Sequence, residues 1–470
     1  MIRACRYLGI GAILLAIGWA VVVAARTQHQ RLASIGADLK SGGNEPPPSP
    51  ARPVAAGCSA SRCHGSAIPA DADKRPGETW RWAATVWSMS DAHQRAFEVL
   101  ESPLSLAIGK HLGGPKPSEN ARCLVCHSDP SLSNHPPDRD IVQARAEGVG
   151  CRACHGDPSK WLAAHLSWGP KEDRRPEYEK VGMTWMNDLP SRAAVCVQCH
   201  VGAPPVGDLL AKDVDHDLIA AGHPRLNFDF ATYMRAMPPH WSEKDRRTHE
   251  PVPEHFAVRA WSAGRLAEMQ AALDLLSYRS DAKSSHPWPE FAEFNCYDCH
   301  HDLKARGRVP DAAGGARGRF GWQRAGELRL LGAKDPTDAF LQAVGTPSPE
   351  ESQVHDLVPA VKSSLQAPPD SPDKLLAWIA ADEAKHPHPN WDQAAWMYQA
   401  LVAIEIDRRG RSKEKAPDLD AEFARLRDKL RLDVVSKDGP RWNSPHSYDP
   451  LAARSLLVDV SKQLRRDLDR

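Results

Sequence analysis

Cysteine and histidine recur in one fixed arrangement along this chain of 470 residues. Four segments follow the pattern C-x-x-C-H, and they end at His127, His155, His200 and His300. The pattern is typical of covalent haem attachment, because each thiol forms a thioether to one vinyl group of a porphyrin and the histidine binds the iron as its proximal ligand. We call these segments motifs 2 to 5. Their cysteines are Cys123, Cys126, Cys151, Cys154, Cys196, Cys199, Cys296 and Cys299.

Zinc and disulfides are the alternative interpretations of such cysteine pairs. C-x-x-C pairs also build tetrahedral thiolate sites for zinc, and exported proteins often carry disulfides. Neither alternative requires a histidine after every pair. Since 21 of the 470 residues are histidine, four chance matches have odds of roughly 10⁻⁵ to 10⁻⁶. The sequence therefore predicts four haems c at these motifs. Cys5, near the N-terminus, belongs to no motif.

A fifth segment, motif 1, has a wider spacing. Four residues separate Cys58 from Cys63, and His64 follows directly. Both thiols can still reach the two vinyl groups if the intervening residues bulge out as a loop. Two alternatives stay open: a single thioether through Cys63 with Cys58 free, or no haem at all. We expect a fifth haem here.

Other histidines are candidates for the second axial position on each iron. His93 follows Ser90, which is a predicted N-cap of a helix that continues to about Leu100. Asp157-Pro158 predicts the start of another helix, and this helix would carry His165 on one face. We therefore expect His93 and His165 to be distal ligands.

Two further candidates lie after motif 4. His216 and His223 are seven residues apart, which is two helical turns or about 10 Å, and they could serve two different haems. His301 cannot bind the same iron as its neighbour His300, but it could turn to an adjacent haem. His111 and His135 are weaker candidates. The histidines expected to be structural or solvent-exposed are His240, His249, His255, His286, His355, His386, His388 and His446.

These segments resemble the multihaem c-type cytochromes, and most closely the cytochrome c-554 type. The resemblance covers residues 57–303 and is carried by the order of the motifs and by the stretches EGVGCRACHG, HDLIAAGHPRL and WPEFAEFNCYDCHHDL. It implies haems packed in close pairs, mostly bis-histidine irons, one haem that can lack a distal ligand, and electron transfer. The related pentahaem nitrite reductases have lysine in the catalytic motif. All five motifs here end in histidine, which argues against that activity.

The N-terminal segment points to export. Residues 7–25 are uncharged and mostly apolar, long enough to cross a bilayer as a helix, and Arg3 and Arg6 precede them. We expect residues 1–26 to be a retained membrane anchor, with a cleaved signal peptide as the alternative. In either case the protein would lie on the periplasmic side, where c-type haem is attached. Residues 27–56 are a proline-rich linker.

Composition predicts a mainly α fold with short helices, long loops and little strand. There are 40 prolines, and no segment shows sustained alternation of apolar and polar residues. Residues 257–279 predict a long amphipathic helix. Residues 57–303 would form a pentahaem domain, 304–370 a connector with one helix around 322–332, and 371–470 a region of two or three helices. In that last region we expect Trp396 and Met397 in a core, and a solvated helix face after residue 410.

Two functions follow from the predicted ligands. An electron relay through five haems is favoured, with a redox protein or a quinone-linked membrane complex as partner. The alternative is a haem enzyme that acts on a small nitrogen or sulfur compound at one iron without a distal ligand. The net charge of zero gives no argument for a nucleic-acid partner.

Overall fold

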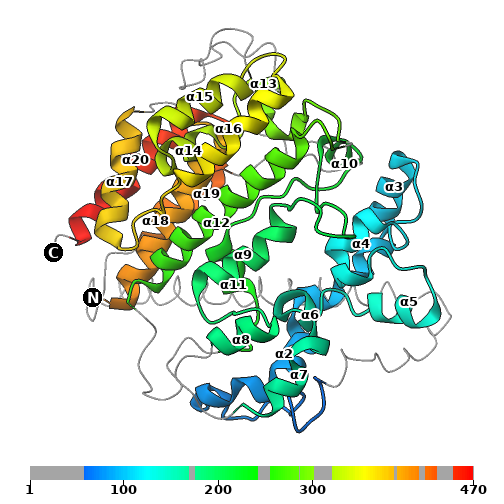
Figure 1. Cartoon of the computed structure of the whole chain (residues 1–470). Helices are drawn as coiled ribbons and strands as arrows, with labels where there is room; N and C mark the ends of the chain where they lie inside the picture. The colour runs from blue at the N-terminus through cyan, green and yellow to red at the C-terminus, as the bar shows by residue number, and fades with distance from the viewer. Residues whose placement is uncertain are drawn as a thin grey trace, which may run out of the picture. The chain divides into compact units, whose positions relative to one another are not determined.

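Helices make up nearly all regular structure in the computed structural model, which describes residues 58–168, 175–241, 254–284, 286–300, 320–385, 389–411, 419–430 and 448–468 (Figure 1). In these ranges β pairing is limited to the isolated bridges Ala203–Lys212, Val206–Leu209 and Phe294–Trp322. The predicted mainly α fold is confirmed. The α-helices are α2 (Ala83–Ser90), α3 (Pro103–Leu112), α4 (Ala121–His127), α5 (Arg139–Arg145), α6 (Cys151–His155), α7 (Pro158–Leu166), α8 (Arg175–Val181), α9 (Leu189–His200), α10 (His216–Ala220), α11 (Phe230–Ala236), α12 (Phe256–Arg279), α13 (Cys296–Cys299), α14 (Ala325–Leu331), α15 (Lys334–Val344), α16 (Glu351–Ser363), α17 (Pro372–Lys385), α18 (Trp391–Arg411), α19 (Asp420–Leu430) and α20 (Pro450–Leu468).

Short helices before α12 begin where the sequence supplies a local capping group. A side-chain oxygen accepts a hydrogen bond from a backbone N–H of the first turn, which satisfies a donor that the helix leaves unpaired. The Asp157–Pro158 start of α7 confirms the prediction from sequence. The capping residues are Ser102 for α3, Asn120 for α4, Asp138 for α5, Asp157 for α7, Asp188 for α9, Asp215 for α10 and Asp229 for α11.

The segment around His93 differs from the prediction. Instead of one helix capped by Ser90, it forms two 3₁₀ helices, η4 (Ala92–Arg95) and η5 (Glu98–Glu101), and Asp91 is the cap. A longer-range contact explains the difference. The carbonyl of His93 accepts a hydrogen bond from the Val149 N–H at 2.9 Å, so this carbonyl bonds a residue next to motif 3 and not the fourth residue along a helix.

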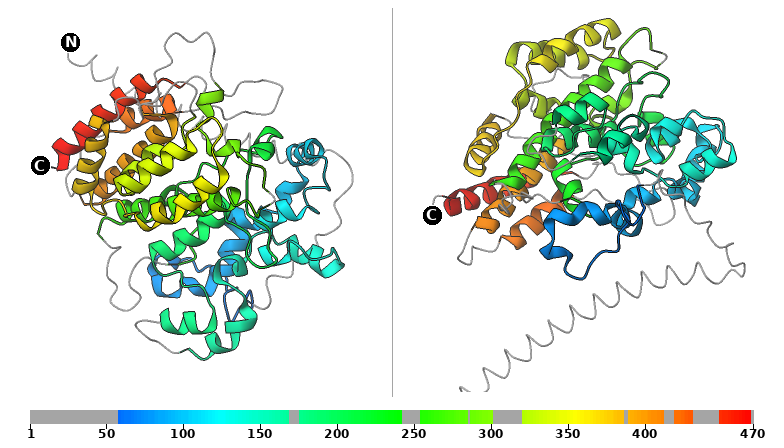
Figure 2. Two further views of the ribbon diagram at one scale, coloured as in Figure 1. Left: turned by 45° about the horizontal axis from the view of Figure 1, so that its top comes forward. Right: turned by 60° about the horizontal axis from the view of Figure 1, so that its bottom comes forward.

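The 24-residue helix α12 lies between the motif-bearing helices and the C-terminal helices (Figures 1 and 2). It contacts α9 and α11 from the first group and α16 and α18 from the second. Gly264 lets α11 approach closely, because a Cβ at this position would lie 2.6 Å from the Cβ of Phe230. Asp407 of α18 accepts hydrogen bonds from the backbone N–H groups of Ala257 and Val258 and so caps α12. The helix predicted over 257–279 is thus confirmed, but it is buried on most sides and not amphipathic as predicted, because helices pack on it from both groups.

Two apolar clusters meet along α12. One joins it to α17–α20 and contains Trp261, Trp396 and Met397, so the predicted core position of the last two is confirmed. The other joins α12 to α14–α16 and contains Trp322 and Phe340. Because both clusters use α12, the motif-bearing region and the C-terminal helices share one core within the compact unit Pro53–Arg470.

The C-terminal half holds more helix than predicted. The helix expected around 322–332 is confirmed as α14, but the rest of the described part of 304–370 is not a plain connector, because α15 and α16 also pack there. Gly332 ends α14 and Gly345 ends α15. The helix α20 has the solvated face expected after residue 410, but its opposite face carries apolar residues that are buried at helical spacing. They are Ala453, Leu457, Val460 and Leu464.

The predicted membrane segment, residues 7–25, lies outside the described residues. Among the helices that are described, none combines the length and the apolar character needed to cross a membrane.

Candidate haem sites

Each motif occupies a short helix or a tight turn that presents its two thiols together. Motif 2 is in α4, motif 3 forms α6, motif 4 ends α9 and motif 5 begins α13. Cysteines three apart in a helix lie on one side of it. Motif 1 is a turn in which the His64 N–H donates to the Cys58 carbonyl at 3.0 Å. This turn brings the two cysteines of the wider spacing together. None of the ten motif cysteines forms a disulfide.

Four of the five motif histidines face a second imidazole. Two imidazoles bound to one metal ion from opposite sides, with metal–nitrogen bonds of about 2.0–2.1 Å, have ring centroids roughly 6.3 Å apart. The observed distances therefore fit one iron between each pair of rings. The pairs are His64–His165 at 6.0 Å, His93–His200 at 6.0 Å, His127–His223 at 6.4 Å and His216–His300 at 6.4 Å.

The four candidates His93, His165, His216 and His223 are thus each placed opposite one motif. His216 and His223 face different motifs, 5 and 2, because α10 ends at Ala220 and Gly222 takes a φ of 116° before His223. A continuous helix would have pointed both rings the same way. His301 lies outside the described residues, and neither His111 nor His135 forms one of the four pairs.

Hydrogen bonds fix the orientation of several of these rings. When Nδ1 donates to a fixed acceptor, Nε2 is left unprotonated and free to bind a metal, which is the usual arrangement of metal-binding histidines. The Nδ1 contacts are His64 to the Trp80 carbonyl at 2.6 Å, His127 to the Ala96 carbonyl at 2.9 Å, His223 to the Pro224 carbonyl at 2.8 Å and His93 to Asp91 Oδ1 at 2.9 Å.

Asp91 is the one charged acceptor among these contacts. Its side chain is 2% exposed. Burial alone would raise the pKa of Asp91, but hydrogen bonds from His93 outweigh burial and lower it. The same hydrogen bond raises the pKa of His93. The sequence analysis took Asp91 only as part of a helix start, although an Asp two residues before a candidate ligand was a usable signal.

Motif 3 has a different environment. The ring of His155 belongs to none of the four pairs, and its Nδ1 is buried without a hydrogen-bond partner. Burial, followed by the neighbouring His240, His64 and His165, lowers the pKa of His155 to about 4. His240, which we expected to be structural or exposed, has a half-buried ring that contributes to this shift. Because Pro238 and Pro239 directly precede His240, no helical spacing in the sequence marks His240 as a candidate ligand.

Motifs that are distant in sequence lie side by side. Cys126 of motif 2 hydrogen-bonds Cys199 of motif 4, and this bond lowers the pKa of the Cys199 thiol to about 7. Burial, and then Cys196 and Cys199, raises the pKa of Cys154 in motif 3 to about 12. This places motif 3 next to motif 4.

Two more contacts complete the neighbour relations. Burial, and then Cys58 of motif 1, raises the pKa of Cys151 in motif 3 to about 11. Arg122, beside Cys123 of motif 2, forms an ion pair of 2.5 Å with Asp215, which precedes His216 opposite motif 5. These relations link motif 1 to 3, 3 to 4, 4 to 2 and 2 to 5, and an ion pair of 3.3 Å between Arg152 in motif 3 and Asp129 also joins motif 3 to the end of motif 2.

Arg225 connects motif 5 with the C-terminal helices. Its guanidinium lies 3.6 Å from the Cys296 sulfur, 2.6 Å from Gln323 Oε1 and 2.7 Å from Asp392 Oδ1 of α18. The buried cation is thus compensated by a carboxylate of the C-terminal region, which fixes that region against motif 5. No local pattern in the sequence indicates this contact, because the partners are 71 to 167 residues apart.

Comparison with protein families supports the interpretation of the motifs. Residues 58–156, which contain motifs 1 to 3, match the family described as "Cytochrome c554 and c-prime". No curated protein and no solved structure gives a significant match to the chain. This segment is therefore similar to a c-type cytochrome family, which agrees with the interpretation of motifs 1 to 3 as sites of covalent haem attachment.

Proposed function

We propose that this protein is an exported electron relay with five haems c, one at each motif. The observation that carries the proposal is the set of four imidazole pairs with centroids 6.0–6.4 Å apart. The proposed proximal ligands are His64, His127, His155, His200 and His300, and the proposed distal ligands are His93, His165, His216 and His223 for motifs 4, 1, 5 and 2.

Paired imidazoles suit electron transfer better than catalysis. Haem c supplies a one-electron couple when it is bound. Two histidines on opposite sides hold the iron six-coordinate in both redox states, so little has to move and no position is left for a substrate. The fixed Nδ1 contacts of His64, His127 and His223 hold the rings in place. The four proposed bis-histidine sites thus favour fast electron transfer over catalysis.

The neighbour relations of the motifs support a continuous route. Thiols of motifs 2 and 4 touch through Cys126 and Cys199, so the porphyrin edges attached there would also approach closely. With the contacts of motif 3 to motifs 1 and 4, the route would run 1–3–4–2–5. Motif 5 would then be at one end of the route.

We further propose that residues 7–25 anchor the relay at the periplasmic face of the membrane. The support is the apolar sequence of this segment and the export that haem c attachment requires. The donor would then be a quinone-linked membrane complex or another redox protein. Comparing the membrane and soluble fractions of cells that express the full chain or residues 27–470 behind a cleavable signal tests the anchor. An equal soluble yield from both would exclude it.

A haem count joined to the ferric spin state tests the relay. We expect five haems per chain by pyridine haemochrome, four of them low-spin by EPR. The double variant Cys196→Ser, Cys199→Ser should lose one haem, and Cys58→Ser should show whether Cys63 alone retains the haem of motif 1. A protein with fewer than four haems, or with mostly high-spin iron, would contradict the proposal.

Motif 3 favours a second function, a haem-dependent oxidoreductase for a small nitrogen or sulfur compound. The specific observation is that His155 has no imidazole at ligand-pair distance among the described residues, while the ring of His240 lies nearby. Ferric high-spin signal from one haem, converted to low-spin by cyanide, would support an open iron. A fully low-spin spectrum in the wild type that becomes one-fifth high-spin in His240→Ala would instead identify His240 as a fifth distal ligand.

A further inference from the structure

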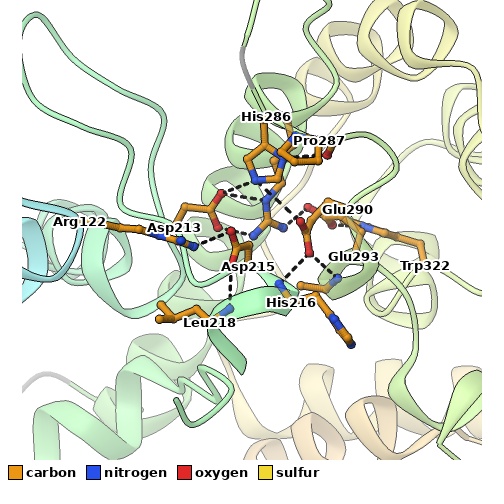
Figure 3. A network of polar contacts seen from close by, with 12 residues as sticks. Arg122, Asp213, Asp215, His216, Leu218, His286, Pro287, Glu290, Glu293 and Trp322 are labelled. Carbon is orange, nitrogen blue, oxygen red and sulfur yellow. Dashed lines mark hydrogen bonds and ion pairs between the residues drawn. The ribbon is translucent and has the colours of Figure 1, made fainter. Parts of the chain in front are cut away.

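A buried polar cluster lies directly behind His216 (Figure 3). Asp215, the cap of α10, meets His286 and Glu290, which lie in the segment between α12 and motif 5. One ligand atom from each of the three lies within 4.8 Å of the other two. This convergence is compatible with one small cation held between two carboxylates and an imidazole.

His286 has the arrangement expected of a metal ligand. Its side chain is 9% exposed, and its Nδ1 lies 2.9 Å from the Pro287 carbonyl. Nε2 is buried and has no hydrogen-bond partner. It lies at ion-pair distance from two carboxylates, 3.2 Å from Asp213 Oδ2 and 3.7 Å from Glu290 Oε2. A buried Nε2 that is left free by a fixed Nδ1 is the usual state of a metal-binding histidine.

The charges of the cluster do not balance. Four carboxylates gather here with two guanidiniums and His286, which leaves two negative charges while His286 is neutral and one when it is protonated. Buried charges without a partner are costly, so one divalent cation would complete the cluster. The carboxylates are Asp213, Asp215, Glu290 and Glu293, and their ion pairs are Arg279–Asp213 at 2.5 Å, Arg279–Glu293 at 2.6 Å and Arg122–Asp215 at 2.5 Å.

We propose that Asp215, His286 and Glu290 bind one divalent transition-metal ion that is separate from the haem irons. An imidazole with two carboxylates suits zinc and its first-row neighbours, whereas calcium and magnesium prefer oxygen ligands alone. Glu290 Oε1 accepts the His216 N–H at 2.8 Å, which leaves Oε2 toward His286. The ion would therefore hold Asp215 and Glu290 in place and, through them, the backbone of the proposed distal ligand His216.

Metal analysis of the purified, haem-loaded full chain tests the site, with zinc as the probe. After chelation and reloading with zinc, the wild type should retain about one zinc per chain beside its haem iron. His286→Ala and Glu290→Gln should each lower the zinc affinity by roughly 10- to 100-fold, as loss of an important metal contact does. His355→Ala is the matched control. Nδ1 of His355 also lies near a backbone carbonyl, that of Ser277 at 2.9 Å, but among the described residues His355 belongs to no group of possible metal ligands.

Two outcomes would overturn the site. If the wild type retains no zinc above the level of His286→Ala, no metal binds, and protonation of His286 and of one carboxyl group compensates the cluster instead. If Glu290→Gln and His355→Ala bind zinc as the wild type does, the ion lies elsewhere. Haem count and spin state are measured on the same samples, so a failure of the relay proposal would be seen separately. Glu290→Gln keeps the size of the side chain and serves if His286→Ala does not fold.

Discussion

Replacing Asp91 by asparagine should raise the reduction potential of one haem. Asp91 Oδ1 lies 2.9 Å from Nδ1 of His93, and the His93 ring faces His200 of motif 4 at 6.0 Å. A carboxylate behind a ligand imidazole stabilises the positive ferric state more than the ferrous state. The Asp91→Asn change removes the charge but keeps an oxygen that accepts the Nδ1–H, so the ring should stay in place.

The size of the effect follows from the geometry. With a ring width of about 2 Å and a metal–nitrogen bond of about 2.0 Å, the carboxylate lies roughly 7 Å from the proposed iron. At an effective dielectric constant of about 20, one charge at this distance contributes about 2 kcal/mol. Since a tenfold change in equilibrium is about 1.4 kcal/mol and about 59 mV for one electron, the potential should rise by roughly 100 mV.

Potentiometric titration followed by EPR and visible absorption measures this shift. Asp138→Asn is the control. Asp138 also caps a helix, but its side chain is exposed, so solvent screens its charge. We expect one potential to move upward in Asp91→Asn and none in Asp138→Asn. If all potentials in Asp91→Asn stay within error of the wild type, or if one moves downward, the pairing of His93 with motif 4 or the role of the carboxylate is wrong.

Three further predictions address the ligands, a glycine and the core. His223→Ala should convert one haem of five to the ferric high-spin state by EPR, whereas His111→Ala should leave the spectrum unchanged. Gly148→Ala should destabilise the protein by about 2–3 kcal/mol in thermal melts, because a Cβ at position 148 would lie 2.4 Å from the carbonyl oxygen of His93. Gly113→Ala has an equally positive φ but no atom within 4 Å, and it should cost only about 1–2 kcal/mol; equal losses would contradict the steric argument. Trp261→Ala should cost about 3–5 kcal/mol with unchanged haem absorption, and a loss of haem would show that the shared core also shapes the motifs.

The fold was predictable from the sequence where the signals are local. Asp157-Pro158 and the apolar spacing of residues 257–279 predicted helices that the structure contains. Near His93 the prediction failed because Val149, 56 residues later, bonds the His93 carbonyl. In α15, α16 and α20 the apolar residues are few and lie among charges, glycines and prolines. Their helices are stabilised mainly by burial against α12 and its neighbours, which a single segment does not reveal.

The same division holds for the site. The sequence by itself determined the chemistry of the motifs, because thiols and an imidazole at fixed spacing act within one turn of chain. It also supplied four histidines that the structure places opposite motifs. Only the tertiary structure decided which histidine faces which motif, which motifs adjoin one another, and that Asp215, His286 and Glu290 converge. These relations depend on contacts between residues up to about a hundred positions apart, and such contacts form only when burial of the shared core brings the segments together.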